Sequence, residues 1–367
     1  MEWNTKTSFP DAFHEVAANL YADDPHWIPE SSTEWKQKFA SSNRYFENAK
    51  AWLDVTPGKA RLAGFFDPTL TIDNARVAYF GYWETNDELN VNRRMFQDFE
   101  RWAAAQGATK VYGPINFTTF NSYRIRLDSF DKGGFPGEPY NKPYYAALLD
   151  SLGYQLCVRY YSIFSSLQSI LPRIQKPMRR LQQRIDGKFF FEPLTASYWM
   201  NRLDDFYRLV DIAFSANMAY SKIQFECFAR DYGATLANRF SPYSSVVAVD
   251  HNDDIAGFLI LLPDYSPLLR QGARHLIAAS DLNYEQHYPL LQNPRFLAKT
   301  TGVHPRYRGK GLMQLMTYFT FNASANYCET IGGVLMREDN STTRLNRLLV
   351  PQHEAKTHGY GLFAKTL

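Results

Sequence analysis

The chain has 367 residues, 40 of them lysine or arginine and 37 aspartate or glutamate, which gives a formal net charge of +3. The length favours two domains, and the near balance of charge excludes a general affinity for nucleic acids or anionic membranes. The three cysteines lie far apart without metal-ligand spacing, so we expect a reduced compartment and no metal ion. The sequence has no signal-peptide pattern and no apolar window of membrane-spanning length, which predicts a cytoplasmic protein without membrane insertion.

The first half of the chain predicts short apolar strands mixed with amphipathic helices. A helix is expected first, at residues 9–21. The order that follows is strand, strand, strand, helix, strand, helix, strand. These seven elements are expected at residues 51–55, 60–66, 76–83, 90–106, 110–113, 144–152 and 154–164.

The second half repeats this kind of order after a basic segment at residues 171–186 that carries two prolines. Strands are expected at residues 188–193, 245–250, 255–262, 296–303, 333–338 and 359–365, and helices at 197–217, 222–238, 312–326 and 341–349, the last capped by Asn340. The shared order of elements argues for a tandem repeat of one α+β domain. We place the two domains at residues 1–168 and 169–367.

Residues 296–319 carry the strongest functional signal. An apolar strand leads into a loop with Gly309, Gly311 and several basic residues, and an amphipathic helix follows. The first N–H groups of such a helix have no intrahelical partners, so they form an anion site that glycines let a bulky anion approach. The spacing fits neither the Walker loop nor the dinucleotide-binding fingerprint, because Gly311 follows Lys310 and Gln314 stands where a third glycine would be needed.

The run from Arg306 to Gly311, Arg-Tyr-Arg-Gly-Lys-Gly, resembles the [QR]-x-x-G-x-[GA] signature of the GNAT superfamily of N-acetyltransferases. The whole chain is similar to bacterial two-domain GNAT-like proteins, which share segments such as DPHWIPE, GP-x-NF and the final motif. The resemblance implies tandem domains, each with a mostly antiparallel mixed sheet flanked by helices, and acetyl-CoA or another acyl-CoA as the co-substrate. The residues that it places at the coenzyme are Thr301, Gly302, Val303, Arg306, Tyr307, Arg308, Gly309, Lys310, Gly311, Leu312 and Asn340.

The resemblance also implies direct attack of an amine on the thioester, with the Val303 N–H as the candidate contact for the carbonyl oxygen. Asn340 would touch the coenzyme arm, or serve only as a helix cap. The family commonly has a tyrosine acid seven residues later, where this chain has Arg347. The candidate catalytic residues are therefore Glu338, Tyr360 and His358, and each could instead be structural.

In the first half, the corresponding turn at residues 84–90 has three carboxylates and no glycine. Like charges would repel a diphosphate there, so we expect only the second half to bind the nucleotide. The first half would buttress the second and close a pocket between them. The segments 113–117 and 140–145 are candidates for the wall of that pocket, or are structural turns with ordinary packing.

The sequence thus predicts an acyl-CoA-dependent N-acyltransferase that acts on a small-molecule amine, with no nucleic acid partner. The sequence leaves open whether the chain forms a homodimer. The alternatives are a non-catalytic acyl-CoA-binding or scaffold protein, and long-chain acyl transfer to an amino lipid precursor. Peptidyl transfer from aminoacyl-tRNA is disfavoured, because the family that performs it lacks this intact loop.

Overall fold

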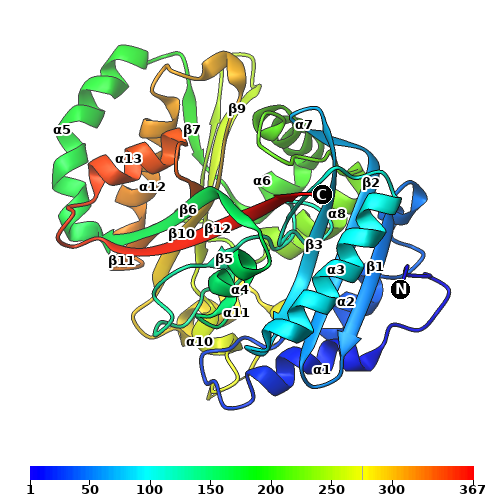
Figure 1. The fold of residues 1–367 in the computed structure, drawn as a ribbon. Helices are drawn as coiled ribbons and strands as arrows, with labels where there is room; N and C mark the ends of the chain where they lie inside the picture. Colours follow the sequence, from blue (N-terminus) through cyan, green and yellow to red (C-terminus); the bar gives the residue numbers. More distant parts are fainter. Residues whose placement is uncertain (275) are drawn as a thin grey trace. The chain divides into compact units, whose positions relative to one another are not determined.

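The computed structural model describes residues 1–274 and 276–367 of the chain. They divide into two units, the first made of Met1–Tyr160, Arg270–Arg274 and Gly359–Leu367, and the second of Tyr161–Leu269 and residues 276–358. Two strands contribute residues to both units, namely β6 (Gln155–Ser166) and β12 (Lys356–Thr366). Both strands are labelled in Figure 1. The domain boundary expected after residue 168 stays a prediction.

The first unit holds a sheet in the order β1-β2-β3-β4-β12, and β5 pairs with β12. Its neighbours are antiparallel except β3 and β4, which are parallel and are joined by the crossover helix α3. The elements of this unit that precede β6 are α1 (Asp11–Leu20), α2 (Ser32–Lys38), a 3-10 helix (Arg44–Glu47), β1 (Lys50–Thr56), β2 (Ala60–Ile72), β3 (Ala75–Thr85), α3 (Leu89–Ala105), β4 (Lys110–Gly113), β5 (Ile125–Arg126) and α4 (Tyr145–Ser151).

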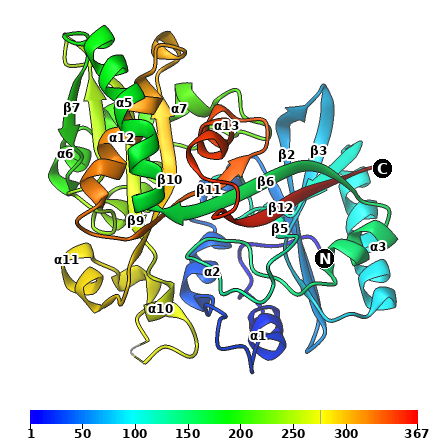
Figure 2. The ribbon, with the colours of Figure 1, turned by 90° about the vertical axis from the view of Figure 1, so that its left-hand side faces the viewer.

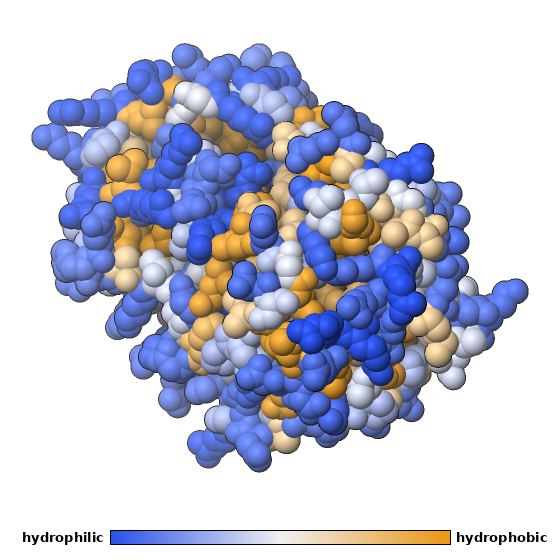
Figure 3. Space-filling model, viewed as in Figure 1, coloured by the Kyte–Doolittle hydropathy of each residue, from blue (hydrophilic) through white to orange (hydrophobic). Residues whose placement is uncertain are grey.

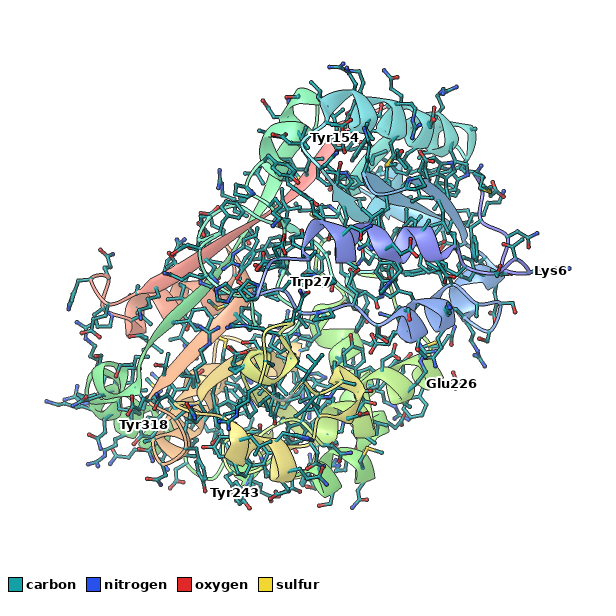
Figure 4. All side chains as sticks on the ribbon, turned by 90° about the horizontal axis from the view of Figure 1, so that it is seen from below. Lys6, Trp27, Tyr154, Glu226, Tyr243 and Tyr318 are labelled. Atoms are coloured by element: carbon teal, nitrogen blue, oxygen red, sulfur yellow. The ribbon has the colours of Figure 1, made fainter. Side chains whose placement is uncertain are left out.

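The core of the first unit lies between its sheet and the helices α3 and α4. Helix α3 buries Met95, Phe96 and Phe99, which are spaced along one face of the helix. Tyr154, labelled in Figure 4 near these helices, packs in the same cluster together with Phe363 of β12. A strand from the far end of the sequence therefore completes the core of the first unit.

The second unit holds strands in the order β6-β11-β10-β9-β8-β7. Here too β7, β8, β9 and β10 pair antiparallel in turn. Strands β10 and β11 are parallel and are joined by the crossover helix α12. The elements between β6 and β12 are α5 (Leu167–Ile185), β7 (Phe190–Pro193), α6 (Ala196–Asn201), α7 (Leu203–Phe214), α8 (Phe225–Tyr232), α9 (Ala234–Ala237), β8 (Val246–Val249), β9 (Ile255–Pro263), α10 (Ser266–Leu269), α11 (Tyr284–His287), β10 (Arg295–Val303), α12 (Leu312–Ser324), β11 (Thr330–Arg337), α13 (Ser341–Leu349) and 3-10 helices at Ala279–Asp281, Tyr288–Leu290 and Pro305–Tyr307.

Helices α5 and α12 lie side by side in the second unit (Figures 1 and 2). Ile170 and Ile174 of α5 share a buried cluster with Leu315 and Met316 of α12. Tyr318 of α12, labelled in Figure 4, packs at the edge of this cluster. The basic segment at residues 171–186 is thus part of an amphipathic helix, α5, that packs against the helix after the motif loop.

The predicted order of elements is confirmed, with a few differences. The helix expected at 197–217 is interrupted at Arg202, whose backbone leaves the helical region, and becomes α6 and α7. The helix expected at 222–238 divides at Gly233 into α8 and α9. Asn340 stands at the N-cap position of α13, but its side-chain oxygen accepts a hydrogen bond from the Ser341 hydroxyl and makes no cap bond to the backbone. Helix α2 was not expected from the sequence.

Hydrophilic residues cover much of the face seen in Figure 3, and hydrophobic residues reach the surface in separate patches between them. Among the helices of residues 1–274 and 276–367, none combines the length and the apolar character needed to cross a membrane.

Candidate active site

The parallel strands β10 and β11 separate part of the way along their length. Their paired residues run from Arg295 and Thr330 to Ala298 and Gly333, whereas the strands continue to Val303 and Arg337. On its other side, β10 stays paired with β9 up to Val303, with a register shift between Ala298 and Thr300. The sheet therefore opens beside the last residues of β10.

The backbone of β10 presents hydrogen-bonding groups to this opening. The His304 N–H donates to the carbonyl oxygen of Ala256 in β9 at 2.9 Å. Ala256 precedes Gly257, the residue that pairs with Val303. Because successive residues of a strand direct their N–H groups to opposite sides, the N–H of Val303 points away from β9, toward the side where β11 has separated. Thr301 and Gly302 precede it on the same strand, and a side chain at Gly302 would collide with Phe258, since a Cβ would lie 2.5 Å from its ring.

The motif loop places two glycines in the left-handed backbone region, at the start of α12. Gly309 has a φ of +74°, and a Cβ built on it would meet nothing within 4 Å. Gly311 has a φ of +89° and is the N-cap of α12, where a Cβ would lie 2.7 Å from Leu181 of α5. The next residue, Leu312, is buried, so its side chain anchors the helix in the core while the first N–H groups of α12 face the loop. The open surface is therefore at Gly309.

The loop is braced against the turn between β8 and β9. The Arg306 guanidinium pairs with the carboxylates of Asp250 and Asp254, at 2.9 and 3.0 Å, and the Tyr307 hydroxyl donates to Asp250. Burial opposes ionisation of Asp250, yet the hydrogen bonds from Tyr307 and from the backbone, together with Arg306, hold its pKa below the usual value. We infer that Arg306 fixes the position of the loop, since its charge is matched by two carboxylates.

The remaining basic residues of the loop are exposed. Arg308 donates to the carbonyl oxygen of Ala213, near the end of α7, at 2.6 Å. The Lys310 ammonium lies 5.3 Å from the centre of the Tyr307 ring. Burial and the nearby Arg306 lower the pKa of His304, although Asp254 acts in the opposite direction, so this ring is neutral near pH 7. Arg308 and Lys310 add positive charge to the surface of the loop, and Arg306 is also exposed there, but it is paired with two carboxylates.

Glu338, directly after β11, lies in a small polar cluster that the sequence did not predict. Its Oε1 accepts a hydrogen bond from the Tyr161 hydroxyl at 3.3 Å and lies 3.9 Å from Nη2 of Arg347. The Arg347 guanidinium is 5.1 Å from the centre of the Tyr161 ring. Tyr161 comes from β6, the neighbour of β11 in the sheet. Only the strand order brings it here, so no local sequence pattern could have found it.

The two other candidate catalytic residues lie in different surroundings. Tyr360 is fully buried in the first unit, where its hydroxyl donates to Glu138, and Glu138 also lies 3.7 Å from Arg126. His358 belongs to the second unit and is buried, with its ring 5.5 Å from that of Phe164. The structure thus groups Glu338 with Tyr161 and Arg347, and Tyr360 with Glu138. The catalytic roles of all three candidates stay predictions.

The first unit has a counterpart of the opening, between β3 and β4, but the chain itself fills it. Past the last parallel pair, Tyr79 with Tyr112, the Ile115 N–H donates to the carbonyl oxygen of Phe80 at 2.7 Å. The Tyr82 N–H then donates to the side-chain oxygen of Asn116 at 2.7 Å. Part of the segment 113–117 therefore bridges the space beside β3, and its expected place in a pocket wall stays a prediction.

The last residues of β3 place Glu84, the first carboxylate of the expected turn, against two tyrosine hydroxyls. Glu84 accepts hydrogen bonds from the hydroxyls of Tyr21 and Tyr145 at 2.9 and 2.6 Å, and Arg61 lies 3.9 Å away. Burial raises the pKa of Glu84 to about 7, although Arg61 and the two hydroxyls act in the opposite direction. Tyr144 and Tyr145, from the other expected pocket segment, bond to the backbone of Thr85.

The chain is similar to known proteins mainly in its fold. No family model matches the chain. One stretch of 151 residues is 28% identical to Protein YghO of Escherichia coli (strain K12), and this match covers 39% of the chain and 38% of that protein. The matched region is therefore well under half of that relative's length.

Solved structures match over nearly the whole chain. A tandem GNAT protein from the clavulanic acid biosynthesis pathway aligns with a TM-score of 0.50 and 10% identity, covering 97% of this chain and 94% of that one. The fold is that of a tandem GNAT protein. A probable N-acyltransferase of Enterococcus faecalis aligns with a TM-score of 0.51 and 10% identity over 100% of this chain and 72% of its own. A glucosamine N-acetyltransferase region of a fungal multi-domain beta-N-acetylglucosaminidase aligns with a TM-score of 0.53 and 12% identity, over 100% of this chain and 38% of its own.

The predicted fold class, tandem GNAT-like α+β domains with mixed sheets, is thereby confirmed. Within the tandem GNAT fold, the separated pair β10 and β11, the glycine loop and α12 form one continuous corner of the second unit. This corner is the candidate site.

Proposed function

We propose that this chain is an acyl-CoA-dependent N-acyltransferase that moves the acyl group directly to an amine of a small molecule, with acetyl-CoA as the expected donor. The observation that carries the proposal is the open corner at Gly309. There the backbone is unobstructed, the first N–H groups of α12 are directed at the loop, and the sheet opens beside β10. These features suit an extended ligand that has a diphosphate at one end.

The residues around Gly309 fit the two parts of a coenzyme A molecule. The N–H groups at the start of α12, with exposed Arg308 and Lys310, would hold the pyrophosphate, while Arg306 and Tyr307 keep the loop in place through Asp250. The extended arm would lie in the opening along residues 301–303, and Asn340, exposed ahead of α13, would contact it from the side of β11. Bound acyl-CoA supplies an activated thioester.

The chain itself would supply positioning and proton transfer. The Val303 N–H, directed away from β9, would donate to the carbonyl oxygen of the thioester and stabilise the charge that develops on it. Glu338 is the base that we favour, because it is half-exposed and held by Tyr161 and Arg347. Tyr360 and His358 remain the alternatives.

One observation favours a second candidate function, a non-catalytic acyl-CoA-binding protein. Arg347 occupies the position at which the resemblance implies a tyrosine acid, and its guanidinium lies near Glu338. If this cation held the carboxylate in place and left it unable to accept a proton, the corner would bind acyl-CoA without transferring the acyl group.

A titration with acyl-CoA molecules separates these possibilities. The melting temperature of the full chain is measured against coenzyme A, acetyl-CoA and acyl-CoAs of increasing chain length, followed by mass spectrometry of an amine panel incubated with each donor. Stabilisation with acylated product supports the transferase. Stabilisation without product from any amine and donor supports the binding protein, and no stabilisation by any of these ligands refutes both functions.

A matched pair of variants tests whether the loop is the binding element. Gly309→Glu places a carboxylate where the pyrophosphate should lie, and we expect acyl-CoA affinity to fall by at least about 100-fold, since like charges meet at close range. Gly58→Glu is the control, because Gly58 has a φ of +70° and equally open surroundings in the first unit. Equal affinity of the two variants would show that the loop is only a turn.

A further inference from the structure

A buried arginine in the first unit lacks the acidic partner that its neighbours have. Arg124 precedes β5 and is only 7% exposed. The carbon of its guanidinium lies 3.7 Å from the centre of the Tyr123 ring and 4.2 Å from that of Tyr160. The two rings stand at 86° to each other, so the guanidinium occupies the corner that they form. Its backbone has a φ of +82°, a region that an arginine seldom adopts.

Arg124 differs from the other buried arginines of this unit in its ion pairing. Arg61 pairs with Glu30 at 2.9 Å, and Arg126 lies 3.7 Å from Glu138. Among residues 1–274 and 276–367, no carboxylate forms an ion pair with Arg124, and its buried Nε has no hydrogen-bond acceptor. Burying a cation without a counter-ion is costly, and the attraction of two aromatic rings offsets only part of that cost.

The arrangement has the form of a receptor for an oxyanion. A guanidinium held against aromatic rings keeps a fixed plane and presents N–H donors along its edge, in a fork that matches a carboxylate or phosphate. The residue is buried, so such an ion pair would be screened little by water. A cationic ligand would be repelled at the same place.

We propose that Arg124, fixed in the corner of Tyr123 and Tyr160, binds the carboxylate or phosphate group of a ligand. All three residues belong to the first unit, whereas Gly309 belongs to the second. The proposal uses no residue of the motif loop, so it can be tested whether or not the chain transfers acyl groups.

The test measures the melting temperature of the full chain in inorganic phosphate and, separately, in acetate, each against sodium chloride at the same ionic strength. We expect at least one oxyanion to stabilise the wild-type chain saturably beyond chloride. Arg124→Gln should weaken that affinity by at least about tenfold. Arg93→Gln, at an exposed arginine of α3, is the matched control and should respond as the wild type does. A response to phosphate alone, or to acetate alone, identifies which group the ligand carries.

Two results would overturn the proposal. One is a wild-type chain that responds to neither anion beyond chloride, and the other is an Arg124→Gln variant with the wild-type response. If Arg124→Gln does not fold, Tyr123→Leu carries the test, because Tyr123 is half-buried and its loss leaves the charge in place. We expect weaker oxyanion binding in this variant, and an unchanged affinity would count against the site.

Discussion

The corner between β3 and α3 and the corner between β10 and α12 have the same strand, turn and helix, yet they use the turn in opposite ways. In the first unit, Ile115 and Asn116 bond to the backbone of β3 beyond its parallel pairs, and Glu84 is buried under two tyrosines. In the second unit, the sheet opens beside β10, and Gly309 has free space around it. The comparison teaches that one fold can leave this corner open or fill it with its own chain.

The largest effect should come from the carboxylate beside the open corner. Glu338→Gln removes the favoured base and should lower kcat by about 10² to 10⁴-fold, roughly 3 to 5 kcal/mol, while KM for acyl-CoA changes little. Steady-state kinetics measures both. Glu192→Gln, at an exposed position of β7 in the same unit, is the control. An unchanged kcat in Glu338→Gln would leave Tyr360 and His358 as the remaining candidates.

The filled corner should show a pH dependence of stability. The pKa of Glu84 is raised from 4.5 to about 7 in the folded chain. The unfolded chain loses this proton near pH 4.5 and the folded chain near pH 7, so the contribution of Glu84 to stability falls as the pH rises through that window, by at most about 3 kcal/mol.

Glu84→Gln should remove this slope, which urea unfolding between pH 4 and 8 can measure. Glu88→Gln, at an exposed carboxylate of the same turn whose pKa is lowered by hydrogen bonds from Lys59 and Asn86, should keep it. If the wild type and Glu84→Gln show equal slopes, the carboxylate is not buried in the way described.

A smaller effect should follow from loosening the brace of the open corner. Arg306→Ala should weaken acyl-CoA binding by about tenfold, or 1.4 kcal/mol, because the loop loses its attachment to the turn between β8 and β9. Asp250→Asn separates this from a direct charge effect. If Arg306 acts through position, removing its negative partner also weakens binding, whereas a gain of affinity in Asp250→Asn would mean that Arg306 contacts the phosphates itself.

The smallest effect should come from the bridge that fills the first corner. Asn116→Ala leaves the N–H of buried Tyr82 without the oxygen that it bonds to, at a cost of about 1 kcal/mol in the free energy of unfolding. Urea unfolding measures this against Asn90→Ala, at an exposed position of α3. Equal stability of the two variants would show that the bridge contributes nothing.

The sequence predicted what short-range patterns encode. The glycine loop, the helix after it and the order of strands along the chain follow from the spacing of apolar residues and glycines within short segments. The GNAT motif covers the loop itself. Contacts between distant segments were not predictable. The pairing of Arg306 with Asp250, the placement of Tyr161 beside Glu338 and the bridge from Asn116 to β3 each depend on strand neighbours that no local pattern specifies.

The place of β12 in the first unit has a consequence for how the protein is made. Residues 363–366 pair with β4, and Phe363 packs in the core of that unit. A ribosome synthesises β4 long before β12, so the early sheet must wait with an open edge while the whole second unit emerges. Such an edge invites pairing with other nascent chains, and a chaperone that shields β4 during translation would protect the yield of this protein more than one that acts after release.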